Sequence, residues 1–512
     1  MIQELKTTVY ALAALLAGLA LLAMLCVPAY RPFLRGRLVP AMICTQVVAF
    51  LSPSLWAFHI LAAAAVPLLA RQRGLIAPLY LFLLLTLPGV ERELRVGGAA
   101  LFTAGLGPSL GLGAAIAMML HRSPPGQRLS SPDVLFGAFW LFTVCVAARD
   151  TNLINYARVA AEQAVMLILP YLIISRTVRT SADIKYAVFG LLAATMALAS
   201  LAIFEALRSW PIYSAVYQHY GISRGIGDAA KMRAGFLRSP GPFAESTSFG
   251  LFLALGFLAM FGGRRFFNSR AHWLLGLMLP AIGLLAPQSR GAWVGAIVGV
   301  MMLTWYRRDW GGFVKQAVAA TVLAGGAIAV GFMSSGFGNI LENYGNLDVK
   351  TDYRAILLQR GMEEFWKNPV VGLPSISVYR ALEDMRQGEQ IVDFVNTYLY
   401  VALVSGGIGL AIFVTILLAP LIWLFSKVLR TRGREGNFAD SFFAMQSGLL
   451  VMLAFTSQTS KTTAMLVFLI AISSRIRSLG VIPGKPPSVD RARLSADRAS
   501  HLPVAPRQPP SA

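Results

Sequence analysis

The chain has 512 residues, 56% of them hydrophobic and 13% charged, and its formal net charge is +21. Its mean hydropathy of +0.62 and its many long apolar runs exclude a soluble globular protein, because no single core buries so many runs. The Lys and Arg residues lie mainly in short connections between these runs and in the tail, as topology signals do, so nucleic acid is not an expected partner.

The sequence therefore predicts an all-α polytopic membrane protein with about 12–15 transmembrane helices. The first run, 7–27, lacks the basic segment and cleavage site of a secretory signal, so it is predicted to be a retained helix. Several runs are short and separated only by turns, which leaves the exact number of helices open. The other candidate spans are 38–53, 55–70, 75–90, 98–120, 133–148, 160–176, 184–206, 246–263, 272–287, 290–306, 314–334, 395–425, 439–457 and 460–476.

Basic connections alternate with less basic ones along the chain, and the positive-inside rule assigns the basic ones to the cytoplasm. The two long polar connections, 208–245 and 335–394, then lie outside, while the side of the N-terminus stays open. The basic connections carry Arg31/Arg35/Arg37, Arg71/Arg73, Arg122/Arg128, Arg176/Arg179/Lys185, Arg264/Arg265/Arg270, Arg307/Arg308/Lys315 and Lys427/Arg430/Arg432/Arg434.

The C-terminal segment 483–512 is rich in Pro, Ser, Ala and Arg and has almost no large apolar residues. It cannot form a core, so the sequence predicts a disordered basic cytoplasmic tail after a membrane domain at 1–482. The three cysteines, Cys26, Cys44 and Cys145, lie within or at the ends of apolar spans, and their spacing supports neither a disulfide nor a metal site. We therefore expect no metal and no cofactor.

Positive charge in the connection 208–245 runs against the topological bias and suggests that an anionic group binds there. Its segment Arg238-Ser-Pro-Gly-Pro-Phe-Ala-Glu245 places an Arg and a Glu on a stiff turn directly before an apolar helix. Arg290 lies in the short turn Pro287–Trp293, where an Arg beside the bilayer costs a few kcal/mol unless it meets a carboxylate or an anionic ligand. The alternative for both arginines is a snorkelling or headgroup-binding role at the membrane boundary.

In the second long connection, apolar residues recur at helical spacing over 352–366 and predict an amphipathic helix that ends before Asn368-Pro369. Its charged residues, Arg360 among them, form either a solvated face or part of a site. The connection ends with Asp393-Phe-Val-Asn396-Thr-Tyr398, at the mouth of the apolar span 395–425.

With these residues in hand, the chain resembles the bacterial O-antigen ligase and O-antigen or exopolysaccharide polymerase superfamily of GT-C-like membrane glycosyltransferases. The resemblance covers a core of about residues 230–425. It rests on Ser289-Arg290-Gly291-Ala292-Trp293, on Arg354 followed by Pro369 and Gly372, on Asn396 followed after nine residues by Gly406-x-x-Gly409, and on Arg238-Ser-Pro-Gly-Pro-Phe243. The family's His is Val395 here, so a His-based mechanism cannot be carried over.

The resemblance implies an enzyme that polymerises undecaprenyl-diphosphate-linked oligosaccharide repeat units into an exopolysaccharide or O-antigen-type polymer. It would act in the bacterial inner membrane, with its site on the periplasmic side, beside membrane lipid and with a flippase and a chain-length regulator of the same pathway as partners. A ligase that transfers the glycan to lipid A core or protein would use the same residues, and Val395 favours the polymerase. A lipid-linked glycan transporter would need charged residues across several spans, and Glu162 and Glu205 are among the few candidates.

This chemistry needs cations for the departing diphosphate and a group that accepts the proton of the attacking hydroxyl. Arg290 and Arg354 are the expected diphosphate clamp, with Arg238 and Arg360 as substrate-binding residues. Asp393 is the expected base and Glu245 its rival, although Asp393 alternatively only stabilises a helix N-terminus. Asn396 and Tyr398 are expected to orient sugar hydroxyls, and the glycines at 406 and 409 to allow close approach of a helix or lipid tail.

Overall fold

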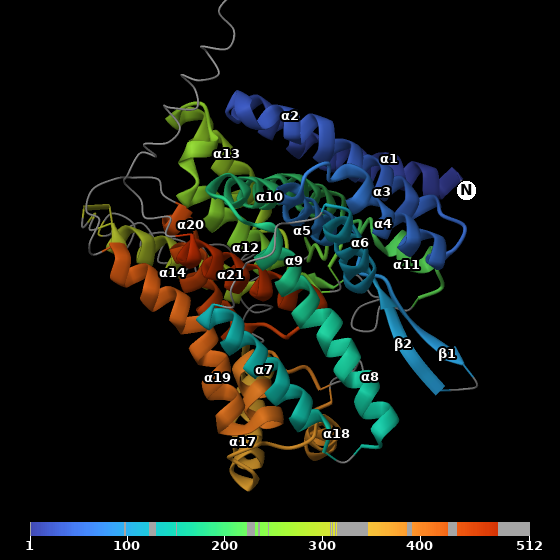
Figure 1. Cartoon of the computed structure of the whole chain (residues 1–512), viewed down its shortest axis with the longest axis vertical. Coiled ribbons are helices and arrows are strands. Elements are labelled where there is room, and N and C mark those ends of the chain that lie inside the picture. The colour runs from blue at the N-terminus through green and yellow to red at the C-terminus, as the bar shows by residue number, and fades with distance from the viewer. Residues whose placement is uncertain are drawn as a thin grey trace, which may run out of the picture.

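The computed structural model describes residues 2–96, 99–121, 130–149, 151–222, 231–233, 236–243, 245–307, 347–386, 392–428 and 438–479, together with a few positions between 309 and 314. The described part is almost wholly helical, and its helices form one bundle from which α7, α8, α17 and α18 extend (Figure 1). The predicted span 314–334, the first part of the connection 335–394 and the tail 483–512 fall almost entirely outside the described residues.

The helices follow one another with short connections. The bundle helices are α1 Ile2–Leu25, α3 Val39–Leu51, α4 Leu55–Leu69, α5 Ile76–Thr86, α6 Leu106–Leu120, α7 Ser131–Ala147, α8 Leu153–Gln163, α9 Leu169–Thr177, α10 Ser181–Arg208, α12 Ser246–Gly262, α13 Arg270–Gly283, α14 Arg290–Tyr306, α19 Thr397–Val428, α20 Phe438–Met452 and α21 Ser460–Ser478. The remaining helices are α2 Arg31–Phe33, α11 Ser214–His219, the 21-residue α17 Leu347–Lys367 and α18 Ser375–Ala381. Single turns occur at Pro28–Tyr30, Leu34–Leu38, Arg73–Leu75, Ala164–Ile168, Arg264–Phe266, Glu383–Met385 and Leu453–Phe455.

Five helical stretches are long and apolar enough to cross a membrane, and six shorter apolar helices accompany them within the described residues. The five are Gln3–Leu25, Pro28–Leu51, Leu153–Thr177, Ser181–Arg208 and Thr397–Ser426. These helices confirm the predicted all-α polytopic membrane protein.

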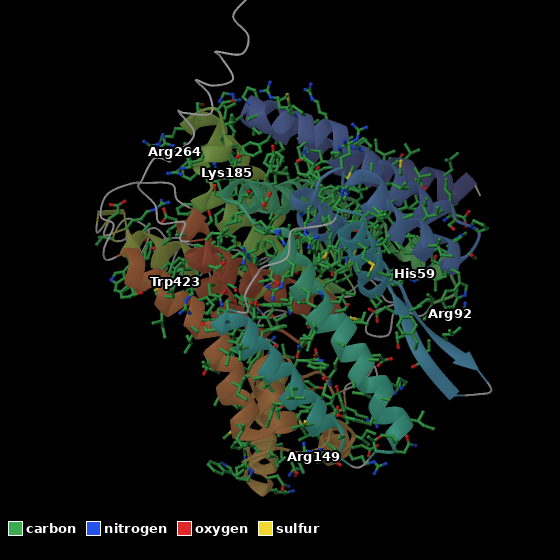
Figure 2. All side chains as sticks on the ribbon, in the orientation of Figure 1. His59, Arg92, Arg149, Lys185, Arg264 and Trp423 are labelled. Atoms are coloured by element: carbon green, nitrogen blue, oxygen red, sulfur yellow. The ribbon has the colours of Figure 1, made fainter. Side chains whose placement is uncertain are left out.

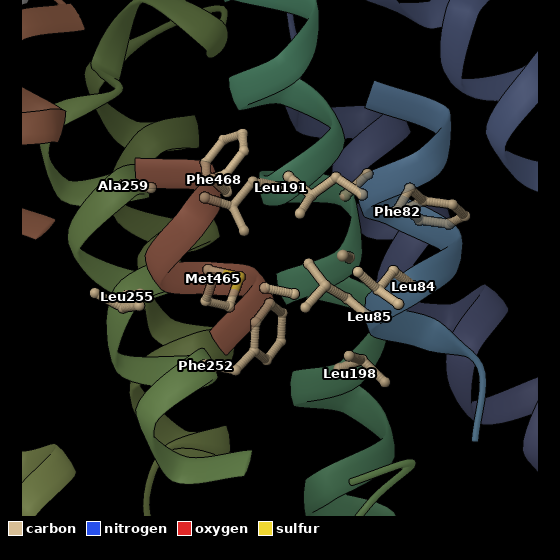
Figure 3. Packing of buried hydrophobic residues seen from close by; sticks show 14 of the residues in the cluster. Phe82, Leu84, Leu85, Leu191, Leu198, Phe252, Leu255, Ala259, Met465 and Phe468 are labelled. Carbon is tan, nitrogen blue, oxygen red and sulfur yellow. The ribbon is translucent and has the colours of Figure 1, made fainter. Parts of the chain in front are cut away.

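The main core lies where α21 packs between α12 and the pair α5 and α10. Figure 3 shows α21, with Met465 and Phe468, between Leu255 and Ala259 of α12 on one side and Leu191 of α10 on the other. Since α10 and α21 are apolar around most of their circumference, they occupy the centre and are enclosed by other helices on all sides.

The bundle has two ends of different chemistry. At one end, which we call the basic end, the connections carry Arg and Lys, and Figure 2 shows Arg264 and Lys185 there, far from Arg149. At the other end, which we call the site end, Tyr217 donates to the carbonyl of Gly89, whose amide donates to the carbonyl of Pro242. The start of α1 is also at the site end, because Glu4 contacts His219 at 2.8 Å.

The predicted span 98–120 is wrong in its first part. Residues Ala99–Gly105 form a strand, β2, paired antiparallel with β1, Glu91–Val96, and only Leu106–Leu120 is helical. The hairpin extends from the site end beside α8 (Figure 1). Hydropathy could not separate these cases, because a strand with an apolar sequence scores like the beginning of a membrane helix. A second, two-residue pairing joins β3, Met232–Arg233, to β4, Phe236–Leu237.

The connection before α19 has a small hydrophobic core of its own, which includes Leu357 of α17, Val378 of α18 and Phe394. As predicted, an amphipathic helix occupies 352–366, and α17 ends at Lys367, directly before Asn368-Pro369. This connection is therefore a packed layer on the site end, with α17 lying against α19.

A joint between two glycines fixes this layer to the bundle. Gly406 interrupts α19 with φ 64° and ψ −169°, and Gly372 has φ 70°. A Cβ on Gly406 would lie 2.3 Å from the carbonyl oxygen of Val370, so the loop after α17 reaches into the interruption. The amide of Gly407 donates to Pro369 at 2.7 Å, and Arg149 at the end of α7 donates to the carbonyl of Gly372 at 2.7 Å.

Candidate functional site

Four helices begin close together at the site end: α12 at Ser246, α14 at Arg290, α19 at Thr397 and α21 at Ser460. Thr459 donates to Ser248 at 3.2 Å, which joins the starts of α21 and α12. Thr397 donates to the carbonyl of Thr456 at 2.7 Å, which joins α19 to the same loop. Since the N-terminal end of each helix carries partial positive charge, this end of the bundle favours an anion.

A buried carboxylate shapes the turn that follows Arg238. Glu205, in α10, is fully buried and accepts hydrogen bonds from the hydroxyl of Ser239 at 2.6 Å and the amide of Gly241 at 3.0 Å. The amide of Ile212 donates to its other oxygen at 3.0 Å. These contacts give Glu205 a structural role, since a buried carboxylate is stable only when its oxygens are bonded.

A buried lysine also binds the backbone of the Arg238–Glu245 turn. Lys461, in the first turn of α21, donates to the carbonyls of Leu87 at 2.6 Å and Pro242 at 2.8 Å, and its ammonium lies 4.4 Å from the ring centroid of Phe243. The lysine therefore ties the end of α5, the Arg238–Glu245 turn and α21 together.

Arg238 lies against the turn that precedes Arg290. Its Nε donates to the carbonyl of Pro287 at 3.3 Å, and Arg233 donates to the carbonyl of Gln288 at 3.0 Å. Arg290 itself is exposed at the first position of α14. The two turns thus hold Arg238 near Arg290, although the guanidinium of Arg238 is partly used in fixing the backbone.

Arg354 lies within electrostatic reach of both Asp393 and Arg290. The side chain of Arg354 is exposed, yet desolvation by the surrounding protein lowers the pKa of its guanidinium, the carboxylate of Asp393 acts to raise it, and the positive charge of Arg290 acts to lower it. The structure thus brings together residues that are far apart in sequence.

Asp393 is half-buried and held by its neighbours. The hydroxyl of Ser457 donates to its carboxylate at 2.6 Å, and the hydroxyl of Tyr353 donates to its backbone carbonyl at 3.4 Å. The amide of Val395, at the family's His position, donates to the same carbonyl at 2.9 Å. Glu245, the rival base, immediately precedes α12 and accepts a hydrogen bond from Thr247 at 3.1 Å.

Three other predicted site residues make structural contacts. The side chain of Asn396 accepts from the amides of Tyr398 at 3.0 Å and Leu399 at 3.2 Å, so it caps α19. The hydroxyl of Tyr398 donates to the carbonyl of Leu450 in α20 at 2.7 Å. Arg360 pairs with Asp384 at 2.7 Å on the surface of the outer layer, with half of its side chain exposed.

Sequence reasoning missed Lys461 and Ser457 and did not assign a contact to Glu205. A signal existed for Lys461, because a charged residue within a predicted apolar span is costly unless it is paired. Ser457 carried no such signal, since its importance comes from a contact with Asp393, 64 residues away in sequence. Among the described residues, no group of three or more His, Cys, Asp or Glu side chains is placed to hold a metal ion.

Part of this chain matches a known protein family. No curated protein matches it. The family model described as O-antigen ligase matches residues 274–414, a segment that contains Arg290, Arg354 and Asp393 together with both glycines of the joint. This family implies a glycosyltransferase-like membrane enzyme, and a lipid-linked glycan is consistent with it as substrate. Residues 274–414 of this multi-pass membrane protein therefore match an O-antigen ligase domain, which is consistent with the O-antigen ligase and polymerase superfamily.

Proposed function

We propose that this protein polymerises undecaprenyl-diphosphate-linked oligosaccharide repeat units into an exopolysaccharide or O-antigen-type polymer. The observation that carries the proposal is the proximity of Arg290, Arg354 and Asp393 at the end of the bundle where four helix N-termini meet. Two guanidinium groups and four positive helix ends suit a diphosphate, and the carboxylate suits an adjacent hydroxyl.

In the proposed reaction, a sugar hydroxyl of one repeat unit attacks the anomeric carbon of another glycan, and the bond from that carbon to the diphosphate oxygen breaks. The hydroxyl proton passes to the carboxylate of Asp393, and the electron pair of the broken bond leaves with undecaprenyl diphosphate. Arg290 and Arg354 stabilise the charge that grows on the leaving group in the transition state. Ser457 positions the carboxylate through the hydrogen bond at 2.6 Å.

We place the reaction at the periplasmic face of a bacterial inner membrane, within a catalytic core at about residues 230–425 of a membrane domain at 1–482. The basic connections at the other end of the bundle support this orientation. A flippase that delivers the donor and a regulator of chain length are the proposed partners. Arg238 and Arg360 are proposed to bind substrate at the rim, and Asn396 and Tyr398 to hold the start of α19 beneath it.

One observation favours the ligase as the second candidate, namely that the matching family model is described as O-antigen ligase. A ligase would use the same clamp and base with a different acceptor. The two candidates separate by product: without a polymerase, single repeat units accumulate on the carrier lipid, whereas without a ligase, finished polymer accumulates and never reaches its acceptor.

The test is complementation of a deletion strain with variants at matched membrane abundance, with glycan chain length read on a gel. We expect Arg290→Ala and Arg354→Ala to abolish polymer. We expect Asp393→Asn to lower its rate by about 10²- to 10⁴-fold, the usual contribution of a general base. Arg386→Ala is the matched control, because this arginine is exposed on the surface of the same layer, where it pairs with Glu383 at 3.3 Å, and it should leave most of the polymer in place.

Full-length polymer from both Arg290→Ala and Arg354→Ala would contradict the diphosphate clamp. If Glu245→Gln lowers the rate of polymer formation more than Asp393→Asn does, Glu245 and not Asp393 is the base. A full set of single repeat units on the carrier in the deletion strain supports the polymerase over the ligase.

A further inference from the structure

A group of arginines at the basic end is not explained by the proposed reaction, because it lies at the other end of the bundle. Arg73 precedes α5, Arg176 and Arg179 lie at the end of α9 and just after it, and Arg475 lies in the last turn of α21. We call these four residues the arginine cluster. All four side chains are half-buried, unlike Arg71 and Arg35, which are exposed at the same end.

The guanidinium groups converge on one short stretch of backbone. Nε of Arg73 and Nε of Arg179 both donate to the carbonyl oxygen of Arg176, at 3.3 and 3.4 Å. Nε of Arg475 donates at 2.8 Å to the carbonyl of Val178, two residues further along. Three guanidinium groups from three parts of the chain are therefore held side by side through their Nε atoms, and Nη1 of Arg73 also donates to the carbonyls of Met118 and His121.

The carboxylates near the cluster are already engaged. Asp133 accepts from the hydroxyl of Tyr171 at 2.6 Å, the amide of Ser130 at 2.8 Å and Arg176 at 3.4 Å. Asp183 caps α10 through the amides of Arg179 and Thr180. In the described part of the chain, no carboxylate forms an ion pair with Arg179 or Arg475.

Positive charge exceeds negative charge here, since two carboxylates, Asp183 and Asp133, which also attracts Arg475, stand against four guanidinium groups. The positive charges of Arg176 and Arg179 act on Arg475, and that of Arg179 acts on Arg73. The positive-inside rule requires arginines at this end, but it does not require them to be half-buried or to converge. Capping of the α9 carbonyls accounts for the Nε atoms and leaves the terminal nitrogens of Arg179 and Arg475, which match the geometry of phosphate oxygens.

We propose that the arginine cluster binds a phosphate group, that of an anionic membrane lipid in the leaflet at the basic end. Basic pockets between membrane helices on the cytoplasmic side recognise such headgroups. The stretch Leu153–Thr177, which ends at the cluster, is a candidate membrane span with only 22% of its apolar window buried within the protein. Leu172, one turn before Arg176, is 38% exposed, so acyl chains have an apolar helix surface beside the headgroup site.

The test uses the purified full chain in a neutral detergent, titrated with phosphatidylglycerol or phosphatidylcholine while lipid binding is followed by native mass spectrometry. The test variant is Arg179→Gln/Arg475→Gln, and the matched control Arg71→Gln/Arg35→Gln removes the same charge from exposed positions at the same end. We expect the wild-type protein to bind phosphatidylglycerol saturably. The affinity should be about 25-fold lower in the test variant, because each arginine contributes a factor of about five, and it should be unchanged in the control. Arg179→Lys/Arg475→Lys, which keeps the charge, should retain part of the affinity.

Equal affinities in the test and control variants, or equal binding of phosphatidylcholine and phosphatidylglycerol, would overturn the proposal. Inorganic phosphate separates the two sources of the ligand. Failure of millimolar phosphate to displace the lipid supports a lipid site, whereas displacement at that concentration would overturn the assignment to lipid and leave a site for soluble phosphate. If the glutamine variant fails to fold, two other measurements test the proposal. Lipid binding by the wild-type protein must weaken as ionic strength rises, and the lysine variant must bind phosphatidylglycerol more weakly than the wild type does.

Discussion

At the scale of single residues, His219 makes two hydrogen bonds, and its partners determine the protonation state of its ring. Its Nδ1 lies 2.8 Å from the carboxylate of Glu4 and its Nε2 lies 2.8 Å from the carbonyl of Ser52. Both partners only accept hydrogen bonds, so both ring nitrogens must donate, which only the imidazolium does. The Ser52 carbonyl and the Glu4 carboxylate accordingly raise the pKa of His219.

A raised pKa in the folded state gives stability that is complete below the ordinary value of about 6.5 and is lost as pH rises through the folded-state value. We therefore predict that the melting temperature falls from pH 6 toward pH 8.5 and that His219→Gln flattens this dependence. Thermal unfolding of the purified protein across this range measures the effect. His272→Gln, at the basic end, is the control, and a slope that both variants leave unchanged would contradict the assignment.

Site residues that belong to local sequence motifs could be predicted from the sequence, whereas residues that act through contacts between distant segments could not. The charges of Asp393 and Arg290 both act on Arg354, while the joint action of the three residues stays a prediction. The prediction was possible because each belongs to a local motif. Lys461 and Ser457 belong to no motif, and their contacts depend on how the loop before α21 meets α5 and Asp393.

At the scale of elements, the interruption of α19 at Gly406 is the feature that orients the outer layer. We predict that Gly406→Ala destabilises this layer, by about 1–3 kcal/mol from the backbone conformation alone, because this φ and ψ combination is nearly confined to glycine. The added Cβ would also meet the Val370 carbonyl at 2.3 Å. Thermal unfolding and polymer synthesis measure the two consequences, stability and function.

Gly137→Ala, in α7, is the control for this prediction, because a Cβ there meets no atom within 4 Å and alanine favours a helix. Its stability should be unchanged or slightly higher. If Gly406→Ala behaves like Gly137→Ala, the joint does not constrain the layer.

Element boundaries show the limit of hydropathy. The sequence predicted the amphipathic helix over 352–366 and its end before Asn368-Pro369, because periodicity and a helix-ending turn agree there. It did not predict that Ala99–Gly105 is a strand, because the pairing with the charged strand Glu91–Val96 is a contact between segments. Only the three-dimensional structure reveals such a pairing.

At the scale of the whole molecule, the two-ended arrangement predicts which positions share a side of the membrane. In a chain whose three cysteines are replaced by alanine, we expect single cysteines at Ser54 and Gln218 to react with a membrane-impermeant maleimide added from the periplasm. Cysteines at Gly36 and Ser269 should react only after the inner membrane is opened. All four positions are exposed.

Reaction of both pairs from the same compartment would contradict the division of the bundle into two ends. If instead Gly36 and Ser269 react from the periplasm and Ser54 and Gln218 do not, the fold is still supported, but the placement of the site on the periplasmic side is contradicted. The alternation of basic connections predicted this division, whereas the end of the bundle at which α1 starts follows from the contact between Glu4 and His219.

The joint between Gly372 and Gly406 has a consequence for which changes of length the chain tolerates. Nine residues separate the cap at Asn396 from Gly406, and an inserted residue would rotate one relative to the other by about 100°, because a helix has about 3.6 residues per turn. The same holds for Pro369 to Gly372, where the carbonyls of Pro369 and Val370 accept hydrogen bonds from the amides of Gly407 and Ile408 in α19. Insertions and deletions should therefore abolish function in these two intervals.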